Sequence, residues 1–203
     1  MQVYLNIPEN FYWNDSFKQF VKIFSFLIAS DDGIAVDLVK GTRIVEDIFD
    51  AIAMKRTKHF HKVNGDLVSE LTHLVQNLAN VRDEWLQKHL ISRGIVKVIL
   101  FLCNEVKYGS YVCIAALDTL QEIIVWSESD PQRLHQVKQI VVESTEPESG
   151  EKGLLILETL ALYDNEEVRE KATEILEDNL DIDMANIFED FVGDDDDLQF
   201  ANN

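Results

Sequence analysis

The feature that most constrains the fold of this chain is a helical pattern that occurs three times. Each copy consists of a short helix, a glycine and an apolar helix, and the copies read DLVKGTRIVEDIFDAI, HLISRGIVKVILFL and EKGLLILETLAL. The glycines are Gly41, Gly94 and Gly153, and a longer helix follows each copy. A unit that recurs in this way cannot bury its apolar face alone, so it must stack on its neighbours.

Apolar residues recur at helical spacing along almost the whole chain, and no stretch rivals this with the two-residue alternation typical of strands. Only three prolines and eight glycines interrupt the 203 residues, which leaves room for long helices. Asp130 and Asn165 are good helix starts, because their side chains accept hydrogen bonds from free backbone N–H groups. The pattern predicts helices over 15–29, 34–40, 43–54, 66–80, 83–92, 95–104, 109–126, 131–143, 153–163 and 166–179.

A short helix, a second helix and a third helix form the unit of an armadillo-type solenoid, whose period is about 40–47 residues. The spacing here is longer, but the intervals contain the polar insertions KRTKHFHKVNGD and ESTEPESGEK. Such insertions cost little, because loop-closure entropy grows slowly with loop length. We therefore expect an all-α fold, an armadillo-type right-handed α-solenoid of about three to four repeats over residues 1–180. A plain helical bundle is the alternative.

The composition changes in the last part of the chain. Residues 181–203 contain no lysine or arginine and include the acidic run from Asp194 to Asp197. Self-repulsion predicts a disordered acidic tail. Apolar residues such as Phe188 and Phe191 lie between the acids, which suits docking on a basic partner; a purely solubilising tail is the alternative.

The whole chain is acidic, with 37 Asp and Glu against 18 Lys and Arg and a net charge of −19. Such a surface repels phosphate backbones and anionic lipids, so we expect no direct contact with nucleic acid or membrane. The N-terminal stretch MQVYLNIPEN does not resemble a signal peptide, and no apolar run approaches the ~20 residues needed to cross a bilayer. We expect a protein of the cytoplasm and nucleus in which Cys103 and Cys113 are buried free thiols.

Motifs of catalytic chemistry do not occur in the sequence. It has no phosphate-cradling glycine loop, no nucleophile elbow and no H-E-x-x-H motif. We therefore expect a binding protein with no enzymatic activity, no cofactor and no metal site.

The third copy of the pattern can be compared with a known family. Residues 153–176, GLLILETLALYDNEEVREKATEIL, resemble without a gap the last armadillo repeat of importin-α. Residues 113–124, CIAALDTLQEII, are similar to the V-A-L-D-G-L-x-N-I-L helix of that family, which also has an acidic tail after its last repeat. The resemblance covers about residues 66–200. It implies an adaptor that binds basic nuclear-localisation-signal peptides of cargo proteins.

The family lines a concave groove with third helices that carry E-x-x-W-x-x-x-N. In SELTHLVQNL, residues 69–78, Glu70 matches the acid, Asn77 matches the asparagine and His73 replaces the tryptophan. The resemblance implies that Glu70 complements a cargo lysine and that the ring at His73 covers the lysine stem. The Asn77 amide would hold the cargo backbone, since it donates and accepts at once.

The neighbouring helices deviate from this motif. Lys22 and Phe26 occupy the tryptophan and asparagine positions of the preceding helix, so cation recognition is expected to fail there. Asp118 and Glu122 occupy them in the following helix, where two carboxylates attract a basic peptide without fixing its register. The expected cargo-binding site is therefore a degenerate groove.

The resemblance also implies other partners. An export receptor or a nucleoporin would dock on the last repeat and the tail, through Glu166, Glu167, Asp194, Asp195, Asp196 and Asp197. Importin-β is not expected to bind, because the chain shows no counterpart of the family's basic N-terminal segment.

Two other functions fit the same sequence. One is an armadillo or HEAT scaffold subunit that binds partner proteins without recognising localisation signals. The other is an acidic histone-type chaperone that acts through its tail. In each case the first helices should leave an apolar end near Phe20, Phe24 and Leu27, which favours self-association or a partner there.

Overall fold

The computed structural model describes residues 15–55, 65–144 and 152–182. Within these ranges the chain forms ten α-helices and two short irregular turns, and it contains no strand. Each of the ten expected helices is present to within two residues at either end, if the π-helical turn after α10 is counted with that helix. The expectation of an all-α fold is confirmed.

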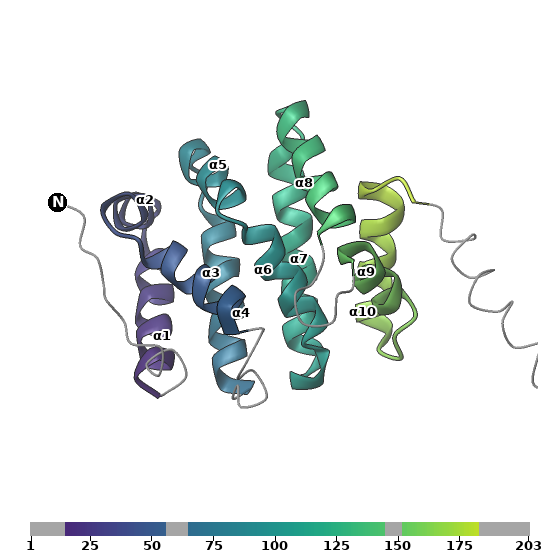
Figure 1. Ribbon diagram of the computed structural model, residues 1–203, viewed down its shortest axis with the longest axis horizontal. Helices are drawn as coiled ribbons and strands as arrows, with labels where there is room; N and C mark the ends of the chain where they lie inside the picture. Colours follow the sequence, from purple (N-terminus) through teal and green to yellow (C-terminus); the bar gives the residue numbers. More distant parts are fainter. Residues whose placement is uncertain (1–14, 56–64, 145–151, 183–203) are drawn as a thin grey trace, which may run out of the picture.

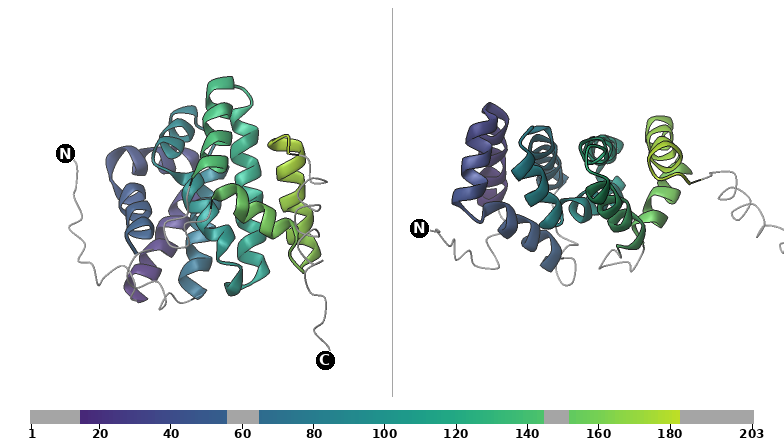
Figure 2. Two further views of the ribbon diagram at one scale, coloured as in Figure 1. Left: turned by 45° about the vertical axis from the view of Figure 1, so that its right-hand side comes forward. Right: turned by 90° about the horizontal axis from the view of Figure 1, so that it is seen from above.

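Four helices lie side by side in a row (Figure 1; Figure 2, right). The row consists of α1 (Asp15–Ser30), α4 (Gly65–Asn80), α7 (Ser110–Ser127) and α10 (Glu166–Glu174). Each row helix packs against the next, α1 against α4, α4 against α7 and α7 against α10. Since row helices follow one another at regular intervals in the sequence, the row extends in chain order.

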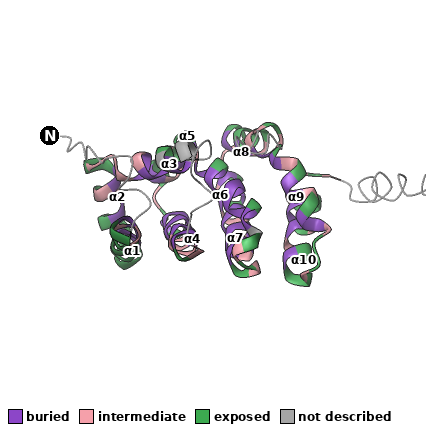
Figure 3. Cartoon of the chain, turned by 60° about the horizontal axis from the view of Figure 1, so that its bottom comes forward, coloured by how far each residue is buried: buried purple, intermediate pink, exposed green. Residues whose placement is uncertain are grey.

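The remaining helices form a second layer on one side of the row (Figure 3). This layer consists of α2 (Asp32–Gly41), α3 (Ile44–Lys55), α5 (Glu84–Ser92), α6 (Ile95–Asn104), α8 (Pro131–Glu143) and α9 (Gly153–Ala161). Two helices of this layer precede each of α4, α7 and α10, so the same three-helix order occurs three times.

The row helices run parallel to one another. Between α1 and α4, Lys18 contacts Asp66 and Lys22 contacts Glu70, so the contacts advance in the same direction along both helices. Between α7 and α10 the same order appears where Asp118 contacts Lys171 and Gln121 contacts Glu174. Equivalent stripes of successive row helices therefore lie next to each other.

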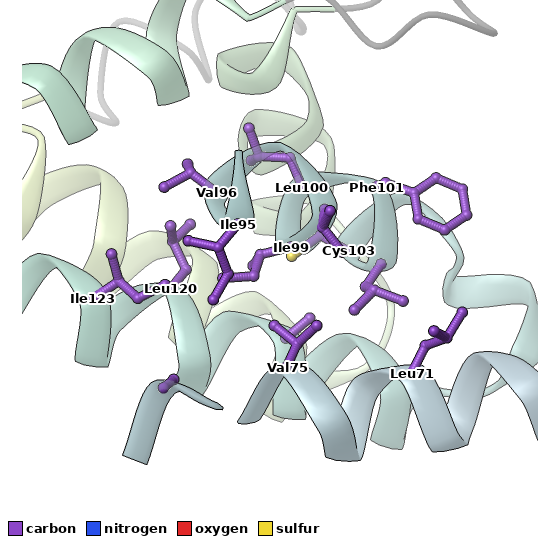
Figure 4. Close-up of a cluster of buried hydrophobic side chains, with 14 of the residues drawn as sticks. Leu71, Val75, Ile95, Val96, Ile99, Leu100, Phe101, Cys103, Leu120 and Ile123 are labelled. Atoms are coloured by element: carbon purple, nitrogen blue, oxygen red, sulfur yellow. The ribbon is translucent and has the colours of Figure 1, made fainter. Parts of the chain in front are cut away.

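The core lies between the two layers and has α6 at its centre (Figure 4). α6 packs against α4 and α7 of the row and against α3, α5, α8 and α9 of its own layer. Eight of its ten residues are buried, which fits the apolar run IVKVILFLC, where only the exposed Lys97 interrupts the apolar residues. Cys103 and Cys113 are buried free thiols, as expected. The neighbouring Cys113 thiol and burial raise the pKa of the Cys103 thiol well above its usual range, so this thiol is neutral and unreactive.

Acidic and amide side chains begin several helices, because the first N–H groups of a helix have no partner within it. Asp130 accepts hydrogen bonds from the backbone of Gln132 and Arg133, and Asn165 accepts one from Val168. Both caps were expected. Asp31 and Asp83 cap α2 and α5 in the same way.

The two irregular turns follow α6 and α10. The first is η3 (Val106–Tyr108), a 3₁₀ turn, and the second is η4 (Ile175–Asn179), a π-helical turn that continues α10. Neither was expected. The acidic tail lies outside the described residues beyond Ile182, so its disorder stays a prediction.

Candidate functional site

The side chains singled out by the sequence lie on the row helices, on a surface that we call the row face. Its residues are Lys18, Lys22, Ser25, Asp66, Glu70, His73, Asn77, Tyr111, Asp118, Gln121, Glu122, Lys171 and Glu174. The stripe Glu70, His73 and Asn77 on α4 faces α1 and α7, and Asp118 and Glu122 lie on the neighbouring α7. The structure therefore brings all five expected cargo-binding residues onto adjacent helices.

Glu70 is paired with a lysine of the same chain. The Lys22 Nζ and Glu70 Oε1 atoms are 3.7 Å apart, and the lysine side chain is 46% exposed. Lys22 occupies the position that corresponds to tryptophan in the importin-α motif quoted above. It places a cation of α1 beside the acid of α4.

His73 lies against Tyr111 of α7. The two ring centroids are 5.8 Å apart, and the tyrosine hydroxyl lies 3.5 Å from the ring nitrogens of the histidine. Tyr111 is 54% exposed. The two rings form an aromatic pair between α4 and α7, although neither helix carries a tryptophan at this place. Sequence analysis missed Tyr111; its signal is its position two helical turns before Asp118.

Asn77 is engaged within the fold. Its Nδ2 atom donates to the Ser25 hydroxyl oxygen over 2.8 Å and lies 3.2 Å from the Ser25 carbonyl oxygen. Ser25 is buried, so this contact joins α1 to α4. Replacing Asn77 would remove this contact between α1 and α4. If an Asn77 variant bound a ligand more weakly, the loss would therefore not by itself show that Asn77 contacts the ligand.

Asp118 is also paired with a lysine. It accepts a hydrogen bond from the Lys171 ammonium of α10, and Gln121 donates to Glu174 over 2.7 Å one turn further on. Glu122 instead accepts from the Trp126 indole N–H of its own helix, over 3.3 Å. Within residues 15–55, 65–144 and 152–182, a lysine neutralises Asp118 but not Glu122.

The pairing with Asp118 raises the pKa of Lys171 above its usual 10.5. The hydrogen bond to Asp118 is the main cause; partial burial opposes it, and Glu167 and Glu174 add to the rise. A lysine whose pKa is higher in the folded than in the unfolded state stabilises the fold fully below the unfolded value. That stabilisation is lost as the pH rises through the folded value.

Urea unfolding of the wild type and of Lys171→Met tests this pairing. The difference between their free energies of unfolding should be constant at neutral pH and should shrink above pH 10.5. Tyrosines and other lysines titrate in both proteins and cancel in the difference. A difference that persists unchanged at higher pH would contradict a stabilising Asp118–Lys171 pair.

Glu166 and Glu167, the expected docking residues of the last helix, lie in the first turn of α10 and are exposed. Their charges are favourable at a helix N-terminus, so they have a local role in addition to any partner. Asp194, Asp195, Asp196 and Asp197 lie outside the described residues.

A second cluster of polar and aromatic side chains lies in the other layer. The Lys40 ammonium lies 4.6 Å from the Trp85 ring centroid, and this ring stacks on His89. His89 contacts Glu46 over 3.1 Å, and Arg93 lies 3.5 Å from the same carboxylate oxygen. These contacts hold α2 and α3 against α5. They pair one oxygen of the buried Glu46 carboxylate, whereas its Oε2 atom has no hydrogen-bond partner among the described residues.

Neither cluster has the composition of a metal site. Among the residues that the structure describes, no three or more His, Cys, Asp and Glu side chains are grouped so that they could hold a metal ion. None of the described helices combines the length and the apolar character of a membrane span.

Comparison with known proteins does not identify the chain: no protein-family model and no curated protein matches it.

Proposed function

We propose that the chain is an armadillo-type α-solenoid that binds basic, extended peptides on its row face, as an importin-α-like adaptor with a degenerate groove. The activity is binding, not catalysis. The observation that carries the proposal is the arrangement of aromatic and carboxylate side chains side by side on α4 and α7. His73 and Tyr111 supply rings, and Glu70, Asp118 and Glu122 supply charge.

These groups suit lysine and arginine side chains. A long basic side chain lays its methylene stem along an aromatic ring and places its charge on a carboxylate. Packed helices lie about 8–10 Å apart, and an extended peptide advances about 3.3 Å per residue. Successive row helices would therefore receive basic residues spaced roughly two or three apart.

Two lysines of the row face, Lys22 and Lys171, support this mode of binding but also limit the affinity for a peptide. Lys22 and Lys171 already bring ammonium groups to Glu70 and Asp118, so the acids accept lysine in the free protein. A peptide lysine must displace them. Glu122 is not paired with a lysine among the described contacts and is available to a ligand without such displacement.

The test is a fluorescence-anisotropy titration with a labelled lysine-rich peptide at two salt concentrations. Because Lys171→Ala frees Asp118, it should tighten binding by about three- to tenfold. Glu122→Gln keeps an acceptor for Trp126 and should weaken binding by a similar factor, about 1 kcal/mol.

The control for net charge is Lys138→Ala. Lys138 pairs with Asp181, away from the row face, at 3.0 Å. Its removal changes the net charge as Lys171→Ala does, so an equal gain from both variants would indicate unspecific attraction. No peptide binding in any variant at low salt would refute the proposal.

A second candidate is a scaffold subunit of the same architecture that binds partner proteins without reading localisation signals. It is favoured by the ion pairs Lys22–Glu70 and Lys171–Asp118, which already engage two carboxylates of the row face. It predicts that Lys171→Ala lowers stability and gains no peptide binding.

The adaptor proposal carries further expectations. The protein would act in both cytoplasm and nucleus, and an export receptor or a nucleoporin would dock on α10 and the tail. Deletion of residues 183–203 should then weaken that second interaction while leaving peptide binding on α4 and α7 unchanged.

A further inference from the structure

A hollow lies on the row face between α1 and α4. Its volume is about 230 Å³, and it is lined by Lys18, Gln19, Lys22, Asp66, Ser69 and Glu70. Because one water occupies about 30 Å³ in the liquid, this hollow has room for the three heavy atoms of a carboxylate group. Its α1 side carries two ammonium groups, and its α4 side carries two carboxylates.

The two lysines of the hollow differ in their partners. Lys18 lies 3.2 Å from Asp66 and 3.7 Å from Asp15, so it has two carboxylates nearby. Lys22 contacts a single carboxylate among the residues that the structure describes, that of Glu70 at 3.7 Å. If a ligand takes Glu70, Lys22 therefore loses its carboxylate partner within the described chain.

The other lysine that a peptide must displace, Lys171, has a different environment. Its ammonium donates to Asp118, and the charges of Glu167 and Glu174 also act on it and raise its pKa. When a peptide takes Asp118, Lys171 still has these two carboxylates of its own helix nearby. Within the described residues, a basic ligand therefore leaves an unpaired ammonium at the α1 end of the row face and not at the α10 end.

We propose that the preferred ligand carries an acidic residue beside its basic stretch, and that Lys22 binds this acid at the hollow. The inference rests on the proposed function, because it requires a peptide lysine to take Glu70. The displaced Lys22 ammonium then exchanges Glu70 for a carboxylate of the ligand, so two ion pairs replace one. A ligand without the acid leaves this ammonium unpaired and binds more weakly.

The net charge of the protein makes the inference easy to test. The chain carries a charge of −19, so unspecific attraction weakens whenever a basic peptide gains acidic residues. Binding of an acid by Lys22 predicts the opposite result, a gain in affinity from acids on one side of the basic stretch. The sign of the effect therefore separates the two explanations.

The test compares three labelled peptides with acetylated and amidated ends and a core of six lysines. One peptide has two glutamines on each side of the core, and the others replace the glutamines on one side or the other by glutamates. Six extended residues span about 20 Å, more than the distance of about 8–10 Å between neighbouring helices, so the core reaches Glu70 in several registers. On the wild type, one of the glutamate peptides should bind about two- to fivefold tighter than the glutamine peptide.

Lys22→Met identifies the partner of the acid. This variant should bind the glutamine peptide more tightly than the wild type does, because Glu70 is then free, and it should bind the glutamate peptides no more tightly than the glutamine peptide. Lys40→Met is the matched control, since it removes a lysine of α2 in the other layer and changes the net charge equally. It should keep the preference of the wild type. Far-UV circular dichroism of both variants checks the fold.

The comparison in the wild type needs no variant and can overturn the inference alone. If neither glutamate peptide binds more tightly than the glutamine peptide, while the latter binds and depends on Glu122, the proposed function stands and Lys22 binds no acid. A preference for glutamate that survives in Lys22→Met also overturns the inference. If none of the peptides binds any of the proteins at low salt, the inference and the proposed function fail together.

Discussion

Replacing Ile99 by alanine is expected to lower the free energy of unfolding by about 2–5 kcal/mol. Ile99 is fully buried in α6, and Figure 4 shows it close to Val75 of α4 and Leu120 of α7. Because α6 packs against six other helices, these cannot all move into the space that the shorter side chain leaves. The cavity therefore persists, and its cost adds to the lost burial.

Urea unfolding followed by far-UV circular dichroism measures the effect. Ile99→Val should cost about 0.5–1.5 kcal/mol, since it leaves a smaller space. Val125→Ala, on an exposed position of α7, should change stability by no more than about 0.5 kcal/mol. A loss below about 1 kcal/mol for Ile99→Ala would contradict the enclosed position of α6.

Gly153→Ala is expected to destabilise the fold by about 1–3 kcal/mol, although alanine favours helices. A Cβ atom at Gly153 would collide with the Val141 carbonyl oxygen and would lie 2.7 Å from the Leu100 side chain. The Gly153 N–H donates to the Ser144 carbonyl oxygen over 2.7 Å, which fixes the start of α9 against α8. The chain cannot move to make room without breaking this contact.

Gly41→Ala is the matched control and should have the opposite sign. A Cβ atom there meets nothing within 4 Å, and its backbone is not left-handed, so alanine should stabilise the protein by about 0.4–1 kcal/mol. Chemical unfolding of both variants compares them directly. Destabilisation of similar size at both positions would mean that the close packing around Gly153 is not the cause.

The three glycines of the repeated pattern show what can and cannot be predicted from the sequence. The pattern treats them as equivalent, and it places all three correctly at helix ends: Gly41 ends α2, Gly94 precedes α6 and Gly153 begins α9. Their reasons differ. Gly94 adopts φ 90°, a conformation that other residues rarely take, Gly153 is required by close packing, and Gly41 by neither. The sequence predicts where one helix ends and the next begins. The reason for a glycine at each of these positions depends on its backbone conformation and on the residues packed around it.

The helices themselves could be predicted because their signals are local. Apolar periodicity and caps such as Asp130 depend on residues within one or two turns. The candidate site depends on partners from other helices. Lys22 beside Glu70, Ser25 beside Asn77 and Tyr111 beside His73 join residues 38 to 52 positions apart, and nothing local encodes those pairs.

The sequence also predicted that α1 is amphipathic, but it did not predict which of its apolar residues are buried. In α1, both Phe24 and Phe26 belong to an apolar helix, yet one is buried and the other is exposed. A helix that packs on one side only leaves a wide arc where an apolar residue finds no neighbour. The exact arc is set by α4, so the uncovered residues could not be read from α1 alone.

The parallel order of the row helices has a mechanical consequence. Extensive contacts join each described row helix to the next, whereas no comparable set of contacts joins α1 to α7 or α4 to α10 within the described residues. A pulling force applied at the two ends would therefore act on every junction between neighbouring helices at once, because the junctions are connected in series. Because each junction can open separately, the molecule would extend in steps as neighbouring row helices separate, and it would not unfold in a single event.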